Sequence, residues 1–232
     1  MNNIKVNLLH YTPKEVLIEA MSMPYKTDNF RNLSTEKAMK KIKAICVDKK
    51  HSSVLEHITF NFKIEGISRL CLQELVRHRL ASYTVESTRY TLPNKEEWNN
   101  IQSKALDLVG GSGEDKDKYN ELATKYIVIP NNIPKYDSQK YISELSFSLL
   151  FTLSELVTDL GVTNDKLKYF LPESWRTNLV MSINIRSLRN FLQLRLSKQA
   201  HFEIRHLANL IIEQIPEEYK ILFEDLNNVL TK

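Results

Sequence analysis

The chain has 232 residues, enough to bury a sizeable core as one large domain or two small ones. With 42% hydrophobic and 26% charged residues, its composition is that of an ordinary soluble globular protein. The formal net charge of +4 suits a phosphate-bearing ligand but is too small to demand a nucleic acid.

Other bulk features exclude membrane and secreted classes. No segment reaches the roughly 18 uninterrupted apolar residues that a membrane span needs. The start, MNNIKVNLLHY, lacks the basic-then-apolar pattern of a signal peptide. The two cysteines, Cys46 and Cys71, give neither a disulfide framework nor a zinc-type pairing. We therefore expect a cytoplasmic protein with no membrane or nucleic-acid partner.

The first ninety residues combine strand and helix patterns. Apolar alternation predicts a strand over 57–67, and Ser68 can cap a following helix that continues through Leu80. The stretch 82–93 is rich in β-branched and aromatic residues, which predicts extended chain closing at Pro93. Upstream, the patterns predict a strand at 4–12, a helix after Pro13 and a helix within 29–47 with Ser34 as a possible N-cap.

A polar segment follows, and then mostly helices. Residues 94–120 contain GGSG at 110–113, which predicts a mobile surface loop, either a tolerated insertion or a functional lid. Later patterns predict a β-like run at 125–134, helices at 138–160, 164–174, 186–196 and 200–215, and a strand at 177–185. Since helices outnumber strands and the strands do not alternate regularly with them, we expect a single domain over 1–232 with an α+β fold.

The stretch RHRLASYTVESTRY, residues 77–90, concentrates groups that bind anions. Arginine forms forked hydrogen bonds with phosphate or carboxylate and stays protonated. In an extended chain, Ser87 and Arg89 would share one face, so a phosphate could meet a hydroxyl and a guanidinium. The alternative is a basic helix end that complements its own dipole. Residue types alone leave the two balanced.

A second arginine-rich stretch is SINIRSLRNFLQLR, residues 182–195. On a helix, Arg186, Asn190 and Gln193 share one face, while Arg195 lies about 180° from Arg186. Arginines on opposite sides suggest contact with a ligand or partner on both sides, whereas the plainer alternative is an ordinary charged surface.

Signals for other chemistries are missing from the sequence. His51 and His57 are six residues apart, which is not the spacing of a helical zinc pair, so we expect no metal. There is no GxGxxG, GxxxxGK[ST] or GxSxG motif. Cys71 falls on an apolar helix stripe, which favours a core position over a nucleophile.

RHR followed after seven residues by Ser87 resembles the RHRx7S signature of the flavin-dependent thymidylate synthases, the ThyX family. HSSVLEH at 51–57 resembles the family's histidine-containing turn, and LPES at 171–174 with 182–195 resembles its block NxRSLxNFLxLR. The matches run in order from about residue 51 to 204, and the pairing of the two motifs is highly specific.

The resemblance implies a ThyX-like α+β fold, with a central, mostly antiparallel twisted sheet flanked by helices and a helical portion. It implies a methyltransferase that converts dUMP to dTMP reductively. Methylenetetrahydrofolate would supply the carbon, NADPH would reduce FAD, and the reduced flavin would deliver a hydride. A homotetramer with active sites shared between subunits is also implied.

The resemblance also assigns roles to residues. Arg195 would be catalytic by stabilising the ionised N3 of uracil, a role that needs no protein nucleophile. Contacts with FAD are implied for Ser53, Arg77, His78, Arg79, Asn184, Arg186 and Asn190. Contacts with dUMP are implied for Glu74, Arg77, Glu86, Ser87, Thr88, Arg89, Lys168 and Arg195.

Two positions depart from the family pattern. Val85 and Glu86 place the glutamate one residue later than in many members, and Lys168 replaces a frequent arginine, keeping the charge but losing the fork. Two other classes stay open on the residues alone: an RNA- or nucleotide-binding module, and a non-catalytic oligomer whose arginines pair with acidic neighbours.

Overall fold

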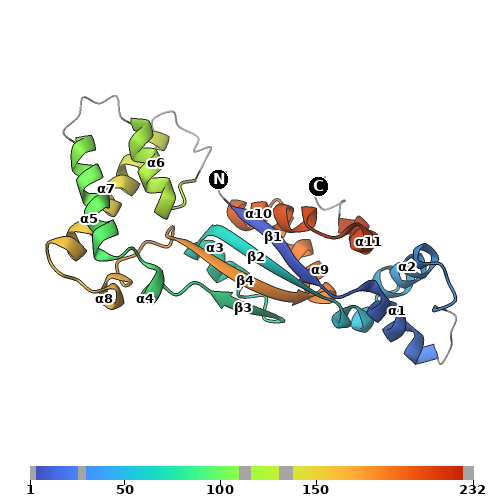
Figure 1. The fold of residues 1–232 in the computed structure, drawn as a ribbon. Coiled ribbons are helices and arrows are strands. Elements are labelled where there is room, and N and C mark those ends of the chain that lie inside the picture. The colour runs from blue at the N-terminus through green and yellow to red at the C-terminus, as the bar shows by residue number, and fades with distance from the viewer. Residues whose placement is uncertain (1–3, 26–29, 110–115, 131–137, 227–232) are drawn as a thin grey trace. The chain divides into compact units, whose positions relative to one another are not determined.

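The computed structural model describes residues 4–25, 30–109, 116–130 and 138–226 (Figure 1). The chain divides into two compact units. We call the one formed by 66–72 and 85–178 the helical unit, and the one formed by 4–65, 73–84 and the residues from 179 onward the sheet unit. The expectation of a single domain over 1–232 stays a prediction.

Four strands form one sheet in the order β1-β2-β4-β3. β1 pairs antiparallel with β2, with Val6 opposite Ile64 and Leu8 opposite Phe62. Alternate residues of β2 are fully buried, as the sequence pattern predicts. The sheet and the many helices confirm the predicted α+β class. The strands are β1 (Lys5–Tyr11), β2 (Thr59–Ser68), β3 (Ala81–Val85) and β4 (Arg176–Asn184).

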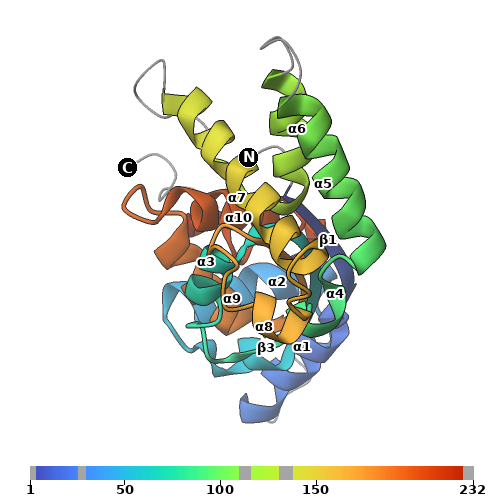
Figure 2. The ribbon, with the colours of Figure 1, turned by 90° about the vertical axis from the view of Figure 1, so that its left-hand side faces the viewer.

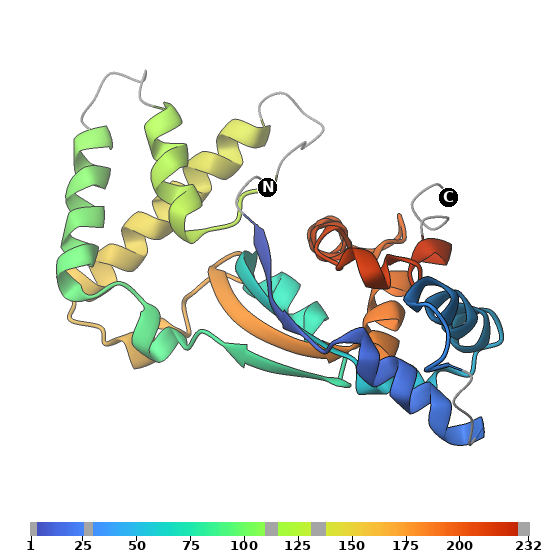
Figure 3. The same ribbon diagram turned by 45° about the vertical axis from the view of Figure 1, so that its right-hand side comes forward.

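The core of the sheet unit is aromatic and aliphatic. Tyr219 is fully buried, meets Phe60 edge to face at 5.5 Å, and donates its hydroxyl hydrogen to the Thr12 carbonyl at 2.7 Å. α10 contacts α9 and β1 (Figure 3). The core stripe predicted for 200–215 is buried in α10 and just after it: Ile204, Leu207, Ala208, Ile211 and Ile215.

Helices of the sheet unit are α1 (Lys14–Ser22), α2 (Thr35–Lys43), α9 (Ile185–Arg195), α10 (Phe202–Glu213) and α11 (Glu217–Lys220). Short 3-10 or π segments are η1 (Met23–Tyr25), η2 (Ala44–Asp48), η3 (Ser52–His57) and η4 (Glu224–Leu226). α3 (Arg69–Leu75) belongs partly to each unit. In the described ranges, no helix has the length and apolar character that a bilayer crossing requires.

The helical unit is built on α7, which packs against both α5 and α6 (Figure 2). Trp98, Leu153 and Trp175 lie in its core. Gly161, with a φ of 66°, follows the end of α7 in the left-handed conformation that glycine tolerates best. Its helices are α4 (Thr88–Thr91), α5 (Lys95–Val109), α6 (Lys116–Tyr126), α7 (Ser138–Thr158) and α8 (Asn164–Leu167).

The surface loop predicted for 94–120 is wrong for most of its length, because α5 and α6 occupy it. Asn94 and Glu97 cap α5 reciprocally: each side chain accepts the other residue's backbone N–H at 2.9 Å. Trp98, Ile101 and Ala105 then bury one face of the helix. The polar outer faces of these helices dominate the composition and hide this pattern. The GGSG run lies outside the described residues.

The extended chain predicted for 82–93 is also wrong in part. β3 ends at Val85, and Thr88–Thr91 form the short helix α4. The Ser87 carbonyl accepts the backbone N–H groups of Tyr90 at 2.9 Å and Thr91 at 3.0 Å, which closes this turn. Ser87 and Arg89 therefore do not share a strand face. The helix predicted to continue through Leu80 instead ends at Leu75.

Candidate functional site

Arg195, the last residue of α9, is held by two side chains of the sheet unit. Its Nε donates to Nε2 of His78 at 3.1 Å, and its Nη1 donates to Oε2 of Glu74 at 2.9 Å. Among the residues that the structure describes, none accepts a hydrogen bond from Nη2. The guanidinium is thus fixed at two points, with one amino group left for a ligand.

His78 is half-buried beside this guanidinium. Its ring meets Phe191 edge to face at 5.0 Å. Burial, followed by the positive charge of Arg195, lowers the pKa of His78. The imidazole is therefore neutral at pH 7, as its role of acceptor at Nε2 requires.

Local hydrogen bonds fix the two segments that carry this cluster, α9 and the turn after α3. Asn184 precedes α9, and its Oδ1 accepts the backbone N–H of Ser187 at 2.9 Å, which fixes where the helix begins. On the other side, the Tyr83 hydroxyl lies 3.0 Å from the Leu75 carbonyl and 2.9 Å from the His78 carbonyl. Tyr83 thus holds the turn that follows α3. Burial raises the pKa of Tyr83 to about 12, so its hydroxyl stays a donor at neutral pH.

The other residues predicted to contact FAD also belong to the sheet unit. Arg77 and Arg79 are exposed, and within the described ranges neither has an ion-pair partner. Arg186 pairs with Glu56. Ser53 lies exposed in η3, and Asn190 is exposed on α9. Two unpaired guanidiniums are the groups that an anionic cofactor with a diphosphate would need.

A second cluster of predicted residues lies in the helical unit, where α4 contacts α8. Oδ1 of Asp165 is 3.4 Å from Nε of Arg89 and 3.8 Å from Nζ of Lys168. Thr88 is on α4, and Ser87 stands at its N-cap. Sequence reasoning missed Asp165; its place three residues before Lys168 was the available signal.

Glu86 is engaged with β4. Its Oε2 accepts the Asn178 side-chain amide at 2.9 Å and the Asn178 backbone N–H at 3.2 Å. Asn178 Oδ1 in turn accepts the backbone N–H of Gly66 at 2.9 Å. Sequence reasoning also missed Asn178, which has no motif to mark it. In this structure Glu86 ties β3's end to β4.

The structure thus brings the predicted residues together in two groups. Glu74, His78 and Arg195 are in direct contact in the sheet unit. Arg89 and Lys168 meet at Asp165 in the helical unit.

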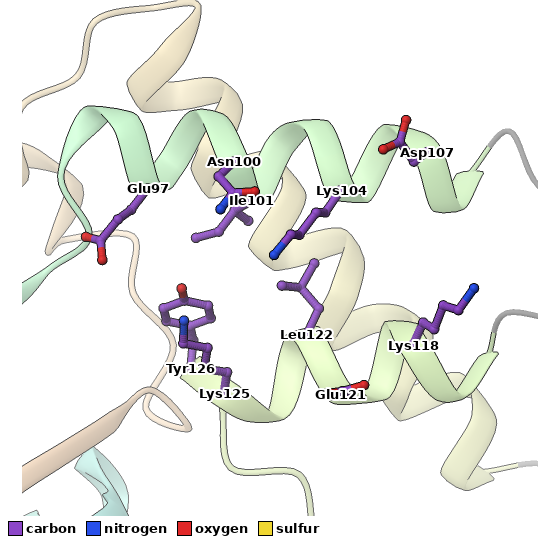
Figure 4. Close-up of a pocket in the computed structure, with 10 residues that line it drawn as sticks. All are labelled: Glu97, Asn100, Ile101, Lys104, Asp107, Lys118, Glu121, Leu122, Lys125 and Tyr126. Carbon is purple, nitrogen blue, oxygen red and sulfur yellow. The ribbon is translucent and has the colours of Figure 1, made fainter.

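A cavity of about 530 Å³ between α5 and α6 contains none of the predicted site residues (Figure 4). Ile101, Leu122 and the Tyr126 ring point into it. Three lysines and three carboxylates balance in charge, and the Glu97 carboxylate caps its own helix. The full lining is Glu97, Asn100, Ile101, Lys104, Asp107, Lys118, Glu121, Leu122, Lys125 and Tyr126.

Both cysteines are buried free thiols, and burial raises the pKa of Cys46 to about 11. A buried, protonated thiol is a poor nucleophile. Over the residues that have described positions, no three His, Cys, Asp or Glu side chains are grouped to hold a metal ion.

Comparison with known proteins places this chain in a family. The family model described as "Thymidylate synthase complementing protein" matches residues 7–219. This chain belongs to the flavin-dependent thymidylate synthase family. The family predicted from the RHRx7S and NxRSLxNFLxLR motifs is thereby confirmed.

Relatives in this family match over nearly their whole length. The flavin-dependent thymidylate synthase of Campylobacter jejuni (strain RM1221) is 37% identical over 221 residues, covering 95% of this chain and 96% of that protein. The Helicobacter pylori (strain ATCC 700392 / 26695) enzyme is 35% identical over 93% of this chain and 95% of its own. A crystal structure of Helicobacter pylori ThyX with FAD and dUMP superposes with a TM-score of 0.80 at 32% identity, covering 99% of this chain and 100% of that one.

Proposed function

We propose that this chain is a thymidylate synthase that uses FAD, methylenetetrahydrofolate and NADPH to convert dUMP to dTMP. The observation that carries the proposal is the full-length similarity to a ThyX structure bound to FAD and dUMP. The family's reaction needs an anion site for a nucleotide phosphate and a positive charge at the pyrimidine, and the two clusters offer both.

The residues present fit FAD. Arg77 and Arg79 carry exposed guanidiniums without ion-pair partners among the described residues, which suits the diphosphate of the cofactor. Ser53, His78, Asn184, Arg186 and Asn190 complete the proposed FAD contacts. When bound and reduced by NADPH, FAD supplies a hydride. Asn184 would act through its backbone or amide nitrogen, since its Oδ1 already caps α9.

The phosphate of dUMP is proposed to bind at α4 and α8. Arg89 and Lys168 supply positive charge, and Ser87 and Thr88 supply hydroxyl groups beside them. Asp165, which contacts both cations, would be displaced or turned away when the phosphate arrives. Arg77, Glu74 and Glu86 are the remaining proposed dUMP contacts.

Arg195 is proposed to be the catalytic residue. Its Nη2 would donate to the pyrimidine and stabilise negative charge at N3, which makes the ring carbon more nucleophilic toward the methylene donor. The buried thiols of Cys46 and Cys71 support a route without a cysteine nucleophile.

We further propose that the chain forms a homotetramer whose active sites are shared between subunits. We also propose that it is located in the cytoplasm. Support for a reducing compartment comes from the two cysteines, which are free thiols. Support for shared sites comes from the exposed side chains of Leu80 and Tyr90, at 77% and 78%, which lie within the segment 77–90.

The experiment combines spectroscopy and turnover. Purified protein should be yellow with non-covalent FAD, and it should form dTMP from dUMP only when methylenetetrahydrofolate and NADPH are both present. A colourless protein that cannot be reconstituted with FAD would refute the proposal. Flavin binding without dTMP formation would reduce the proposal to a flavoprotein of other activity.

A further inference from the structure

The hydrogen bond between Arg195 and His78 constrains both side chains. Nε of Arg195 always carries its hydrogen, so Nε2 of His78 must be the acceptor in their 3.1 Å contact. The imidazole is then neutral, with its hydrogen on Nδ1. No acceptor for Nδ1 exists among the residues that the structure describes. His78 therefore has one nitrogen committed to Arg195 and one donor to offer.

The neighbours of His78 maintain this state. Among the described residues, the charged group that acts on its ring is the Arg195 guanidinium from α9, which in turn binds the Glu74 carboxylate of α3. Phe191 covers one side of the ring from α9, and Tyr83 of β3 contacts the His78 carbonyl rather than the ring. A proton on Nε2 would remove the acceptor and place two cations in contact, which burial makes costly.

We propose that His78 is a positioning residue for catalysis: by accepting the Arg195 Nε–H, its imidazole orients the guanidinium and fixes Nδ1–H as the donor toward bound FAD. Glu74 is the second support of the same guanidinium. This inference rests on the proposed function, because it gives Arg195 its catalytic role. It adds a coupling: the group that contacts the cofactor also sets the direction of the group that contacts the pyrimidine.

Two substitutions separate the two nitrogens of His78. In His78→Asn, the amide nitrogen replaces Nδ1 but nothing reaches Arg195. In His78→Gln, the longer amide places its oxygen near the position of Nε2. We expect His78→Asn to keep its FAD content while kcat falls about tenfold to hundredfold. We expect His78→Gln to recover most of that loss.

A double-mutant cycle shows whether the effect passes through Arg195. In an Arg195→Ala background, His78→Asn should slow dTMP formation no further. An equal fold-loss in both backgrounds, or unchanged kcat in His78→Asn, would overturn the inference. The acid side of the kcat profile should show the His78 titration in the wild type and lose it in His78→Gln.

A measurement without turnover keeps this test separate from the proposed function. In ligand-free protein, ¹⁵N NMR of the imidazoles should show His78 as the Nδ1–H tautomer with a pKa below the usual range, assigned by its absence in His78→Asn. Arg195→Ala should raise that pKa and mix the tautomers. An unchanged His78 signal in Arg195→Ala would overturn the inference, whereas wild-type protein with this signal but no dTMP formation would refute only the proposed function.

Discussion

Asp165 contacts two cations at once, with its Oδ1 3.4 Å from Nε of Arg89 and 3.8 Å from Nζ of Lys168. Both cations are proposed to bind the phosphate of dUMP. The Asp165 carboxylate therefore neutralises part of the positive charge that would bind the substrate. The phosphate of dUMP must compete with this carboxylate for Arg89 and Lys168.

Asp165→Asn should tighten dUMP binding, because the phosphate no longer competes with a carboxylate. We expect the KM for dUMP to fall roughly two- to fivefold, with kcat nearly unchanged, as suits an exposed ion pair. Steady-state kinetics at low ionic strength measures this. Asp48→Asn, which removes the same charge in the sheet unit, should leave the KM for dUMP as in wild type; a rise in KM for Asp165→Asn would mean that Asp165 assists binding.

Arg195→Ala should retain bound FAD but lose most of its dTMP formation. Removing one group that stabilises developing negative charge costs about 10²-fold or more in kcat. Flavin absorbance after gel filtration and single-turnover dTMP formation check the two halves separately. Arg186→Ala, on the same helix but at a proposed FAD contact, should show the opposite defect, a loss of bound FAD. Full activity in Arg195→Ala would remove this residue from the mechanism.

Cys46→Ala and Cys71→Ala test the absence of a cysteine nucleophile. Each thiol is buried, and burial raises the pKa of Cys46 to about 11. We expect kcat to stay within about twofold of wild type, since neither thiolate takes part, while thermal midpoints fall because small cavities form. Loss of dTMP formation in a variant that still unfolds cooperatively would point to a thiol in the chemistry.

Tyr219→Phe should destabilise the sheet unit by about 1–2 kcal/mol, because the Thr12 carbonyl loses its buried donor. Burial raises the pKa of Tyr219, so the folded state favours the protonated phenol. The wild type therefore keeps this contribution below the ordinary tyrosine pKa of about 10 and loses it as pH rises further. Urea unfolding at pH 8 and pH 10.5 should show a larger difference between wild type and Tyr219→Phe at pH 8. If the difference in unfolding free energy is the same at both pH values, the contribution of the hydrogen bond does not depend on the titration of Tyr219.

The predicted elements were most accurate where burial imposes a strict period. The alternation in β2 and the stripe on α10 are both buried as predicted. The long helix that ends before Gly161 and the strand before α9 also lie where the patterns placed them. These segments bury one face against neighbours of the same unit, so hydrophobic spacing carries the information.

The errors occurred where polar residues or short-range hydrogen bonds determine the secondary structure. α5 and α6 were predicted as a loop because their outer faces and the nearby GGSG run dominate the composition. α4 was predicted as extended because its β-branched and aromatic residues favour strands. In the structure, the hydrogen bonds that the Ser87 carbonyl accepts override this preference.

Motifs named the candidate site residues but not their partners. The RHRx7S and NxRSLxNFLxLR motifs include Arg195 and His78, yet the hydrogen bond between them joins positions 117 residues apart. Asp165 and Asn178 lie outside both motifs, and only three-dimensional proximity gives them a role.

The cap at Asn184 fixes the start of α9, so the length of the helix determines where Arg195 lies. The helix has 11 residues, begins directly after Asn184, whose side chain caps it, and ends at Arg195. Each residue added or removed between them would swing Arg195 by about 100° around the axis and shift it by about 1.5 Å. Substitutions along α9 can change its surface, but its length is not free to vary.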